Sequence, residues 1–327
     1  MDRWEPDFDF YMAQIEDKPA SFVVDLNAAR EAPVAGYELL LSIRVPMLRP
    51  RPDGLRDASE LDDLGAVEDQ FVEALAEKVD AIYVGRTVHD GETTLYMYVP
   101  EAHRAALDDL PALTGAPPGD YQPAWGVIDD PAWQQYLGFL SPGEYALQSI
   151  WNRRLVKQFA ELNDQLDVAR EVDHLAYFPD REAAEQAATA LAAAGFRVDE
   201  PTAREDEEDA EGEEDAEGED GDEGDEAEAE GDEVEAEGDG DEVEADEAEA
   251  VEADDDAGED EEEEDADEDD EADDDGVEDG DRWALQFHRT DALADGRPDE
   301  FTDEILDVIL PLGGSYDGWG AEHRKAE

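Results

Sequence analysis

The chain has 327 residues, with 99 Asp or Glu against 22 Lys or Arg and a formal net charge of −77. A field of this sign repels nucleic-acid phosphates, so we expect no direct nucleic-acid binding and favour a basic protein partner. Cysteine is absent, which excludes disulfides, thiolate catalysis and cysteine-based zinc sites.

The first 140 residues are predicted to form one α+β domain. Residues 8–15 and 20–26 are predicted to form two strands of a hairpin with a turn of about four residues. A third strand is predicted at 37–45. The later elements are a helix that begins near Ser59, two strands joined by a tight Asp-Gly turn, a helix and a strand, at residues 59–79, 81–88, 93–99, 101–110 and 124–128. From the third strand onward the order is β-α-β-β-α-β, the split β-α-β or ferredoxin-like arrangement.

Residues 141–167 are predicted to form a long helix that connects two domains. Ser141, Pro142 and Glu144 give the cap, the first-turn proline and the acidic residue typical of a helix start. Apolar residues then recur every three or four positions over about 25 residues, at 147, 151, 155, 159, 162 and 166. One face of this helix should therefore be covered.

A second α+β domain is predicted for residues 168–327. Its elements are a strand at 174–178, an alanine-rich helix capped by Asp180 and ended by Gly195, a strand at 196–198, an alternating strand from Trp283, a helix at 298–310 and a strand at 315–319. The order is again β-α-β-β-α-β, so we expect a second ferredoxin-like fold.

An acidic run interrupts this second domain. Residues 205–281 contain 51 Asp or Glu and no Lys or Arg, and short units such as EDAEGE at 208–213 recur in tandem. Nothing in the run can close a hydrophobic core, so we predict a disordered insertion, 201–281, in the loop of the middle hairpin. A solvated spacer is the favoured interpretation of the run, and mimicry of a polyanion toward a basic surface is the alternative.

Catalytic and metal-binding patterns are weak. His174 and His288 fall on strands that should be neighbours, but structural or surface histidines explain the pair better than a shared site, because no third ligand lies at a telling spacing. An approximate calcium-loop spacing from Glu233 to Glu244 suits loose counterion binding at most. No nucleophile-elbow, phosphate-loop, dinucleotide or zinc-protease motif is present, so we expect no enzyme, no cofactor and no metal.

The densest basic cluster is Asn152-Arg153-Arg154 with Lys157. In so acidic a chain its more common role is to pair with the protein's own carboxylates, although it could hold a phosphate or an acidic partner. The amino-terminal segment lacks the basic and apolar regions of a signal peptide, and no apolar run approaches the roughly 18 residues of a membrane span. We therefore expect a cytoplasmic protein.

Two resemblances add to this interpretation. The segment 170–178 (REVDHLAYF), the helix end at Gly195-Phe196 and the Trp283 strand resemble the bacterial family called regulator of ribonuclease activity B, over residues 168–327. Residues of the first domain resemble a domain-of-unknown-function family, number six-nine-five, which brings no activity: Trp4, Phe10-Tyr11, Val24-Asp25-Leu26, the PRPDGL loop and Val84-Gly85-Arg86.

The first resemblance implies a non-enzymatic regulator that binds and inhibits an RNase E-type endoribonuclease by masking a basic, RNA-binding segment. Its partner-binding candidates are His174, Tyr177, Phe178 and Trp283. The alternative is an uncharacterised enzyme or ligand-binding module in the first domain, with the acidic run only a solubilising or salt-adapted spacer.

Overall fold

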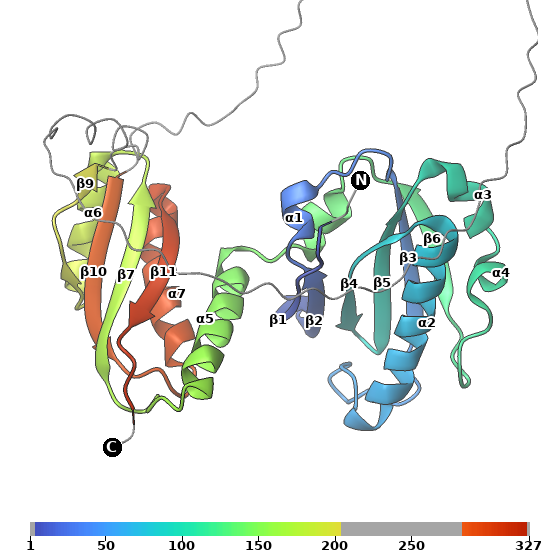
Figure 1. Ribbon diagram of the computed structural model, residues 1–327, viewed down its shortest axis with the longest axis horizontal. Coiled ribbons are helices and arrows are strands. Elements are labelled where there is room, and N and C mark those ends of the chain that lie inside the picture. The colour runs from blue at the N-terminus through green and yellow to red at the C-terminus, as the bar shows by residue number, and fades with distance from the viewer. Residues whose placement is uncertain (1–3, 204–282, 326–327) are drawn as a thin grey trace, which may run out of the picture. The chain divides into compact units, whose positions relative to one another are not determined.

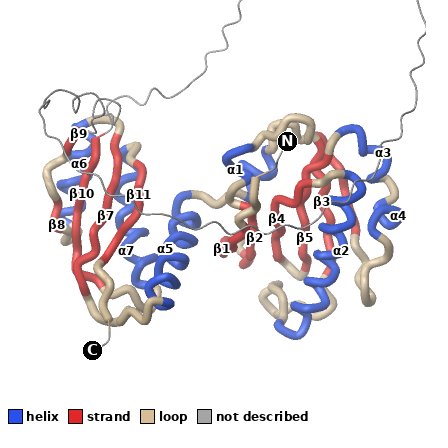
Figure 2. Tube along the Cα trace, viewed as in Figure 1, coloured by secondary structure: helices blue, strands red, loops and turns tan. Residues whose placement is uncertain are grey.

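The computed structural model describes residues 4–203 and 283–325. The disorder predicted for the acidic run and the calcium-like spacing within it lie outside the described residues. One boundary is corrected, because Thr202–Ala203 forms a short strand, β9, inside the range assigned to the insertion. The described chain is α+β with two antiparallel sheets, shown in Figures 1 and 2.

The N-terminal sheet has six strands in the order β1-β2-β4-β5-β3-β6, and all neighbours are antiparallel. Its strands are β1 (Phe8–Ile15), β2 (Lys18–Asp25), β3 (Leu39–Pro46), β4 (Ile82–His89), β5 (Glu92–Val99) and β6 (Ala124–Asp129). Its helices are α1 (Ala28–Glu31), α2 (Leu61–Val79), α3 (Arg104–Leu107) and α4 (Leu110–Thr114). The hairpin β1-β2 thus extends a four-stranded β4-β5-β3-β6 unit.

Both faces of this sheet are covered, which explains the nearly continuous apolar run in β3. Leu39 and Leu41 pack with α2 on one face, whereas Leu40 belongs to the cluster on the other. On that second face the Trp133 ring stacks on Tyr98 at 3.8 Å between centroids. The short amphipathic segment before the connecting helix therefore closes the second layer.

Two local expectations for this part are wrong. The first hairpin turns over two residues rather than four, since Glu16 and Asp17 both take positive φ, 50° and 62°. That left-handed pair is the geometry of a tight type I′ hairpin. The helix expected at 101–110 is broken into a 3-10 turn, α3 and α4, and α4 begins at Leu110 with a proline in its first turn.

The C-terminal sheet has the order β11-β7-β10-β8, with β9 also pairing with β10. Its strands are β7 (Arg170–Phe178), β8 (Arg197–Val198), β10 (Trp283–Asp291) and β11 (Ser315–Ala321), and its helices are α6 (Arg181–Ala193) and α7 (Arg297–Ile309). Both helices lie against one face, as Figure 1 shows, over a core that includes Phe178, Leu191, Leu285, Phe287, Phe301 and Ile305. The predicted alternation in β10 is confirmed, because Leu285 and Phe287 are fully buried.

The connecting helix, α5 (Glu144–Glu161), is 18 residues long, shorter than the predicted 141–167. It ends where Asn163 takes a left-handed φ of 59°. The following Asp164 accepts a hydrogen bond from Arg170 at 2.8 Å, in a pair whose side chains are both fully buried. This buried contact holds the loop after α5 against the start of β7.

The buried face of α5 also differs from the predicted apolar stripe. Its buried residues are Gln148, Ile150 and Asn152. Asn152 donates to Thr302 on α7 at 2.9 Å and accepts from the Trp319 indole at 2.8 Å. These polar contacts and the Phe159 ring, which stacks on Trp319, hold α5 beside α7 and β11, and the expected stripe is left partly exposed, with Trp151 at 40%.

A short hairpin should replace residues 204–282 without loss of the fold. Ala203 and Trp283 are cross-strand partners, and such partners lie about 5 Å apart between Cα atoms. Two residues, Asn-Gly, can bridge that distance as a type I′ turn. We expect cooperative thermal unfolding at a temperature equal to or above that of the parent chain, because a shorter loop costs less closure entropy. Loss of cooperative unfolding would show that the removed residues are needed for folding.

The two aromatic residues of β10 should contribute unequally to stability. Phe287 is fully buried and contacts the rings of His174 and Phe196, whereas Trp283 is only partly buried. Phe287→Ala should lower the free energy of unfolding by about 3–5 kcal/mol, and Trp283→Ala by clearly less. Urea titration of both variants measures this difference. Equal losses would contradict the burial assigned to the strand.

Candidate binding site

The C-terminal sheet presents one face that neither α6 nor α7 covers. Along β7 the residues alternate, so that Val172 and Ala176 enter the core while Asp173 and Leu175 point to the opposite face. Gln286 and His288 of β10 share that opposite face. We call this surface the open face.

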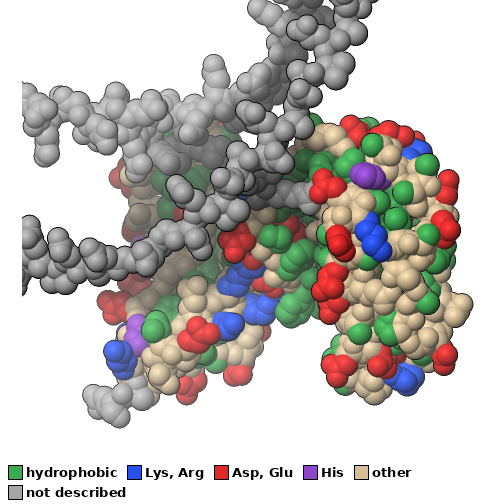
Figure 3. Space-filling model, turned by 45° about the vertical axis from the view of Figure 1, so that its right-hand side comes forward, with side chains coloured by type: hydrophobic (Ala, Val, Ile, Leu, Met, Phe, Trp, Pro, Cys, Tyr) green, Lys and Arg blue, Asp and Glu red, His purple; other side chains and the backbone are tan. Residues whose placement is uncertain are grey.

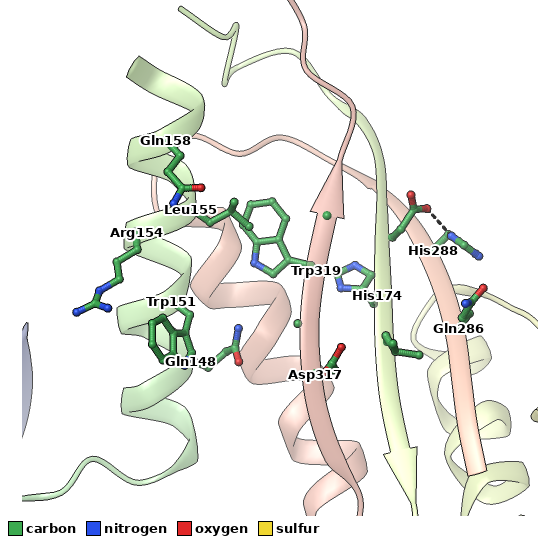
Figure 4. Close-up of a pocket in the computed structure, with 14 residues that line it drawn as sticks. Gln148, Trp151, Arg154, Leu155, Gln158, His174, Gln286, His288, Asp317 and Trp319 are labelled. Carbon is green, nitrogen blue, oxygen red and sulfur yellow. Dashed lines mark hydrogen bonds and ion pairs between the residues drawn. The ribbon is translucent and has the colours of Figure 1, made fainter. Parts of the chain in front are cut away.

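A groove of about 800 Å³ lies between α5 and the open face. Figure 4 shows α5 on one side of β11, with β7 and β10 on the other. The groove is lined by Gln148, Trp151, Arg154, Leu155, Gln158, Asp173, His174, Leu175, Gln286, His288, Asp317, Gly318, Trp319 and Gly320. Trp151 and Leu155, which sequence periodicity assigned to a covered helix face, form its apolar rim.

Two glycines shape the floor of the groove. Gly318 and Gly320 of β11 are the partners of Leu175 and Asp173, and a Cβ atom at either glycine would meet nothing within 4 Å. Among the described residues, the space above β11 at these two positions is therefore open. Gly318 has a φ of 134° and is restricted to glycine, whereas Gly320 has an ordinary backbone conformation.

Charged groups gather at the far side of the open face. The Asp173 carboxylate lies 2.5 Å from His288 Nδ1, and Asp199 lies 3.1 Å from Nε2 of the same ring. Burial lowers the pKa of His288, but the hydrogen bonds with the two carboxylates outweigh burial and raise the pKa above its usual 6.5. Next to this group, Arg197 donates two hydrogen bonds to Glu171, at 2.8 and 3.2 Å.

The open face is therefore acidic and polar around His288, and it is apolar beside α5. Figure 3 shows that acidic side chains are also spread over the visible surface of the described residues. An extended segment with basic and aromatic or aliphatic side chains has complementary chemistry, because carboxylates pair with its cations while Trp151 offers an exposed ring.

His174 also lines the groove, but its ring points to the opposite side of the sheet from His288, although their strands are neighbours. His174 faces the core, is 3% exposed and stacks on Phe287 at 5.1 Å between centroids. Its Nδ1 lies 2.7 Å from the Tyr316 hydroxyl. Burial lowers the pKa of His174 to about 3, so the ring is neutral near pH 7. His174 therefore packs as a neutral ring in the core of the C-terminal sheet.

The partner-binding candidates from the sequence fall in two environments. His174 and Phe178 lie in the core, at 3% and 1% exposure. Tyr177 and Trp283 are partly exposed, and the Arg181 guanidinium lies 5.4 Å from the centroid of the Trp283 ring. A role of these residues in partner binding stays a prediction.

Sequence analysis missed the groove residues on α5 and β11. Periodicity marks Trp151 and Leu155 as apolar positions of a helix but does not say what covers them. The available signal was the pair Gly318 and Gly320 on either side of Trp319 in the last strand, since glycine within a strand marks a place where another group approaches closely.

The basic cluster pairs with the chain's own carboxylates, as expected. Arg154 contacts Asp7 and Asp9, Arg153 also contacts Asp9, and Lys157 pairs with Glu161 at 3.8 Å. These contacts leave the alternative, a bound phosphate, without support from the geometry.

Four carboxylates are buried in the described N-terminal part. Glu68 pairs with Arg56 and Arg86, and the other three accept hydrogen bonds from nearby chain segments. Asp25 accepts from the Trp4 indole at 2.6 Å, Glu60 from the backbone of Leu48 at 2.6 Å, and Asp130 from the Tyr98 hydroxyl at 2.6 Å. Each also accepts at least one further hydrogen bond from protein groups. These three carboxylates anchor loops.

Two protein-family models match separate segments of the chain. Residues 4–141 match the model of a Family of unknown function (DUF695), and residues 149–237 match the model of Regulator of ribonuclease activity B. Both resemblances seen in the sequence are thereby confirmed. Neither the curated proteins nor the solved structures give a match.

The match to the ribonuclease regulator includes much of the groove. Trp151 and Leu155 of α5 and Asp173 and Leu175 of β7 lie within residues 149–237, whereas β10 and β11 follow that segment.

Within the described residues, no helix is both long enough and apolar enough to cross a membrane.

The two histidines should titrate in opposite directions from the usual value of 6.5. Protonated His288 is favoured by folding, so its stabilising effect is complete below pH 6.5 and is lost as the pH rises through its raised pKa. Neutral His174 is favoured by folding, so its effect is present above pH 6.5 and is lost as the pH falls toward its pKa of about 3.

NMR titration of the imidazole nitrogens in the presence of a chelator measures both pKa values, with His288→Gln and His174→Gln used for assignment. We expect the His288 signal to change above pH 6.5 and the His174 signal to remain that of a neutral ring well below it. Similar pKa values for both rings would contradict the opposite environments described above.

Proposed function

We propose that the chain is a non-enzymatic regulator that binds a ribonuclease through its C-terminal sheet. One observation carries this proposal: within a segment matching Regulator of ribonuclease activity B, the half-exposed Trp151 and Leu155 line a groove that opens onto an acidic sheet face. Such a groove suits binding of a polypeptide segment.

The partner in this proposal is an RNase E-type endoribonuclease, and the bound segment is a basic part of it that contacts RNA. The carboxylates Asp173 and Asp317 line the groove. They would pair with Lys or Arg of such a segment, which would then be unavailable to RNA phosphates. Inhibition would follow from occupancy alone, without any chemical step.

We also infer that the chain contains two domains of the split β-α-β type. In support, the strands of β3-α2-β4-β5-α3/α4-β6 lie in the sheet order fourth, first, third, second, and so do those of β7-α6-β8-β10-α7-β11. Boundaries at 1–140 and 168–327, with α5 and the loops around it between them, agree with the separate cores. In this proposal the insertion lies within the second domain.

Filling the groove, or removing its exposed aromatic ring, should weaken inhibition. Gly320→Leu places a large side chain in open space without backbone strain, and Trp151→Ala removes the exposed ring. Gly126→Leu is a matched control, since Gly126 is an exposed strand glycine of β6 with similar space. The measurement is the rate of RNA cleavage by an RNase E-type enzyme, titrated with each full-length variant.

We expect Gly126→Leu to inhibit like the parent chain and both groove variants to need at least about tenfold more protein, equivalent to 1.4 kcal/mol of binding. Retained inhibition by Gly320→Leu would place the binding surface elsewhere. If the parent chain neither binds the enzyme nor slows cleavage, the regulatory function itself is refuted.

A further inference from the structure

Three potential metal ligands converge on the open face from two adjacent strands. Glu171 and Asp173 of β7 and His288 of β10 each offer one ligand atom, and these three atoms lie within 4.8 Å of one another. The pairing of β7 with β10 places His288 opposite Asp173. Their positions are therefore set by the sheet rather than by a loop.

A fourth residue orients the histidine. His288 is hydrogen-bonded on both sides, to Asp173 at Nδ1 and to Asp199 at Nε2. A metal that replaces the Nδ1 proton would lie between Nδ1 and the Asp173 carboxylate, while Nε2 keeps the proton that it donates to Asp199. A carboxylate that holds the second nitrogen of a ligating histidine is the usual arrangement around protein-bound metals.

We propose that Glu171, Asp173 and His288 bind a transition-metal dication of the Zn²⁺ type, with Asp199 as the positioning residue. One imidazole nitrogen with two carboxylate oxygens suits such a metal better than Mg²⁺ or Ca²⁺, which prefer oxygen ligands alone. The proposal is independent of ribonuclease binding, because it concerns the chain by itself.

Arg197 makes this proposal sharply testable, because it competes with the metal. Its guanidinium occupies the Glu171 carboxylate with two hydrogen bonds and adds a positive charge beside the site. Removing it should free one ligand and reduce repulsion of the cation. A metal site therefore predicts that Arg197→Gln binds more tightly, whereas an ordinary ion-pair cluster gives no reason for such a gain.

The experiment is a Zn²⁺ titration of the full-length protein in excess Mg²⁺, which occupies carboxylates that bind cations without a nitrogen ligand. Two readouts are needed: heat of binding, and the NMR signals of the His288 ring. His288→Ala and Asp199→Asn should weaken binding about 10- to 100-fold, as loss of a ligand or its orienting carboxylate does. Arg197→Gln should tighten it by several-fold.

Matched controls come from α6, where Arg181 and Glu185 form a similarly exposed ion pair. Arg181→Gln and Glu185→Gln should leave Zn²⁺ affinity unchanged. The proposal is overturned if Zn²⁺ leaves the His288 signals unchanged, or if Arg197→Gln changes affinity no more than Arg181→Gln does. Equal binding by parent and His288→Ala would assign the cation to other carboxylates of the chain.

Discussion

The antiparallel pairing of β7 with β10 is the interaction on which the C-terminal part depends. Nine residues of each strand are in register, from Trp283 opposite Phe178 to Asp291 opposite Arg170. Since the two strands lie on either side of the acidic run in the sequence, this pairing joins two separated segments into one sheet. It also fixes which side chains enter the core, because a shift of one residue would turn every side chain to the other face.

The same register produces both the core and the open face. His174 and Phe287 are partners and both enter the core, while Asp173 and His288 are partners and both point away from it. The two histidines are on neighbouring strands, but their surroundings favour opposite protonation states. His174 is kept neutral among aromatic rings, and His288 is held between carboxylates that favour its charged form.

Much of the fold could be predicted from the sequence because its signals are local. Alternation identified the inward residues of β10, Asp180 marked the start of α6 through its hydrogen bond to the Ala183 amide, and Asp90-Gly91 gave the tight turn between β4 and β5. The end of α5 was missed because the apolar spacing continues through Leu162 and Leu166, whereas the helix ends before the left-handed Asn163 and the next residues are held by the buried contact of Asp164 with Arg170. Local periodicity contains no information about such a contact.

The groove could not be predicted for a related reason. Whether Trp151 is covered depends on which side of α5 packs against α7, and long-range contacts such as the hydrogen bond from Asn152 to Thr302 accompany that orientation. An apolar helix position is ordinarily assigned to the core, so a functional surface made from such positions is the kind of feature that pattern analysis assigns wrongly. The acidic side of the groove was equally hidden, because Asp173, Asp199 and His288 meet only through strand pairing.

Because Ala203 and Trp283 are cross-strand partners, the insertion between them can change in length during evolution. The insertion leaves and re-enters the sheet at one cross-strand pair, so its length does not alter the geometry on either side. Each doubling of a flexible loop adds only about 0.6 kcal/mol of closure cost. Tandem units such as EDAEGE can therefore be duplicated or lost with little effect on folding, and each copy changes the charge by four. Selection can adjust the charge of this chain in steps, independently of the domain that carries it.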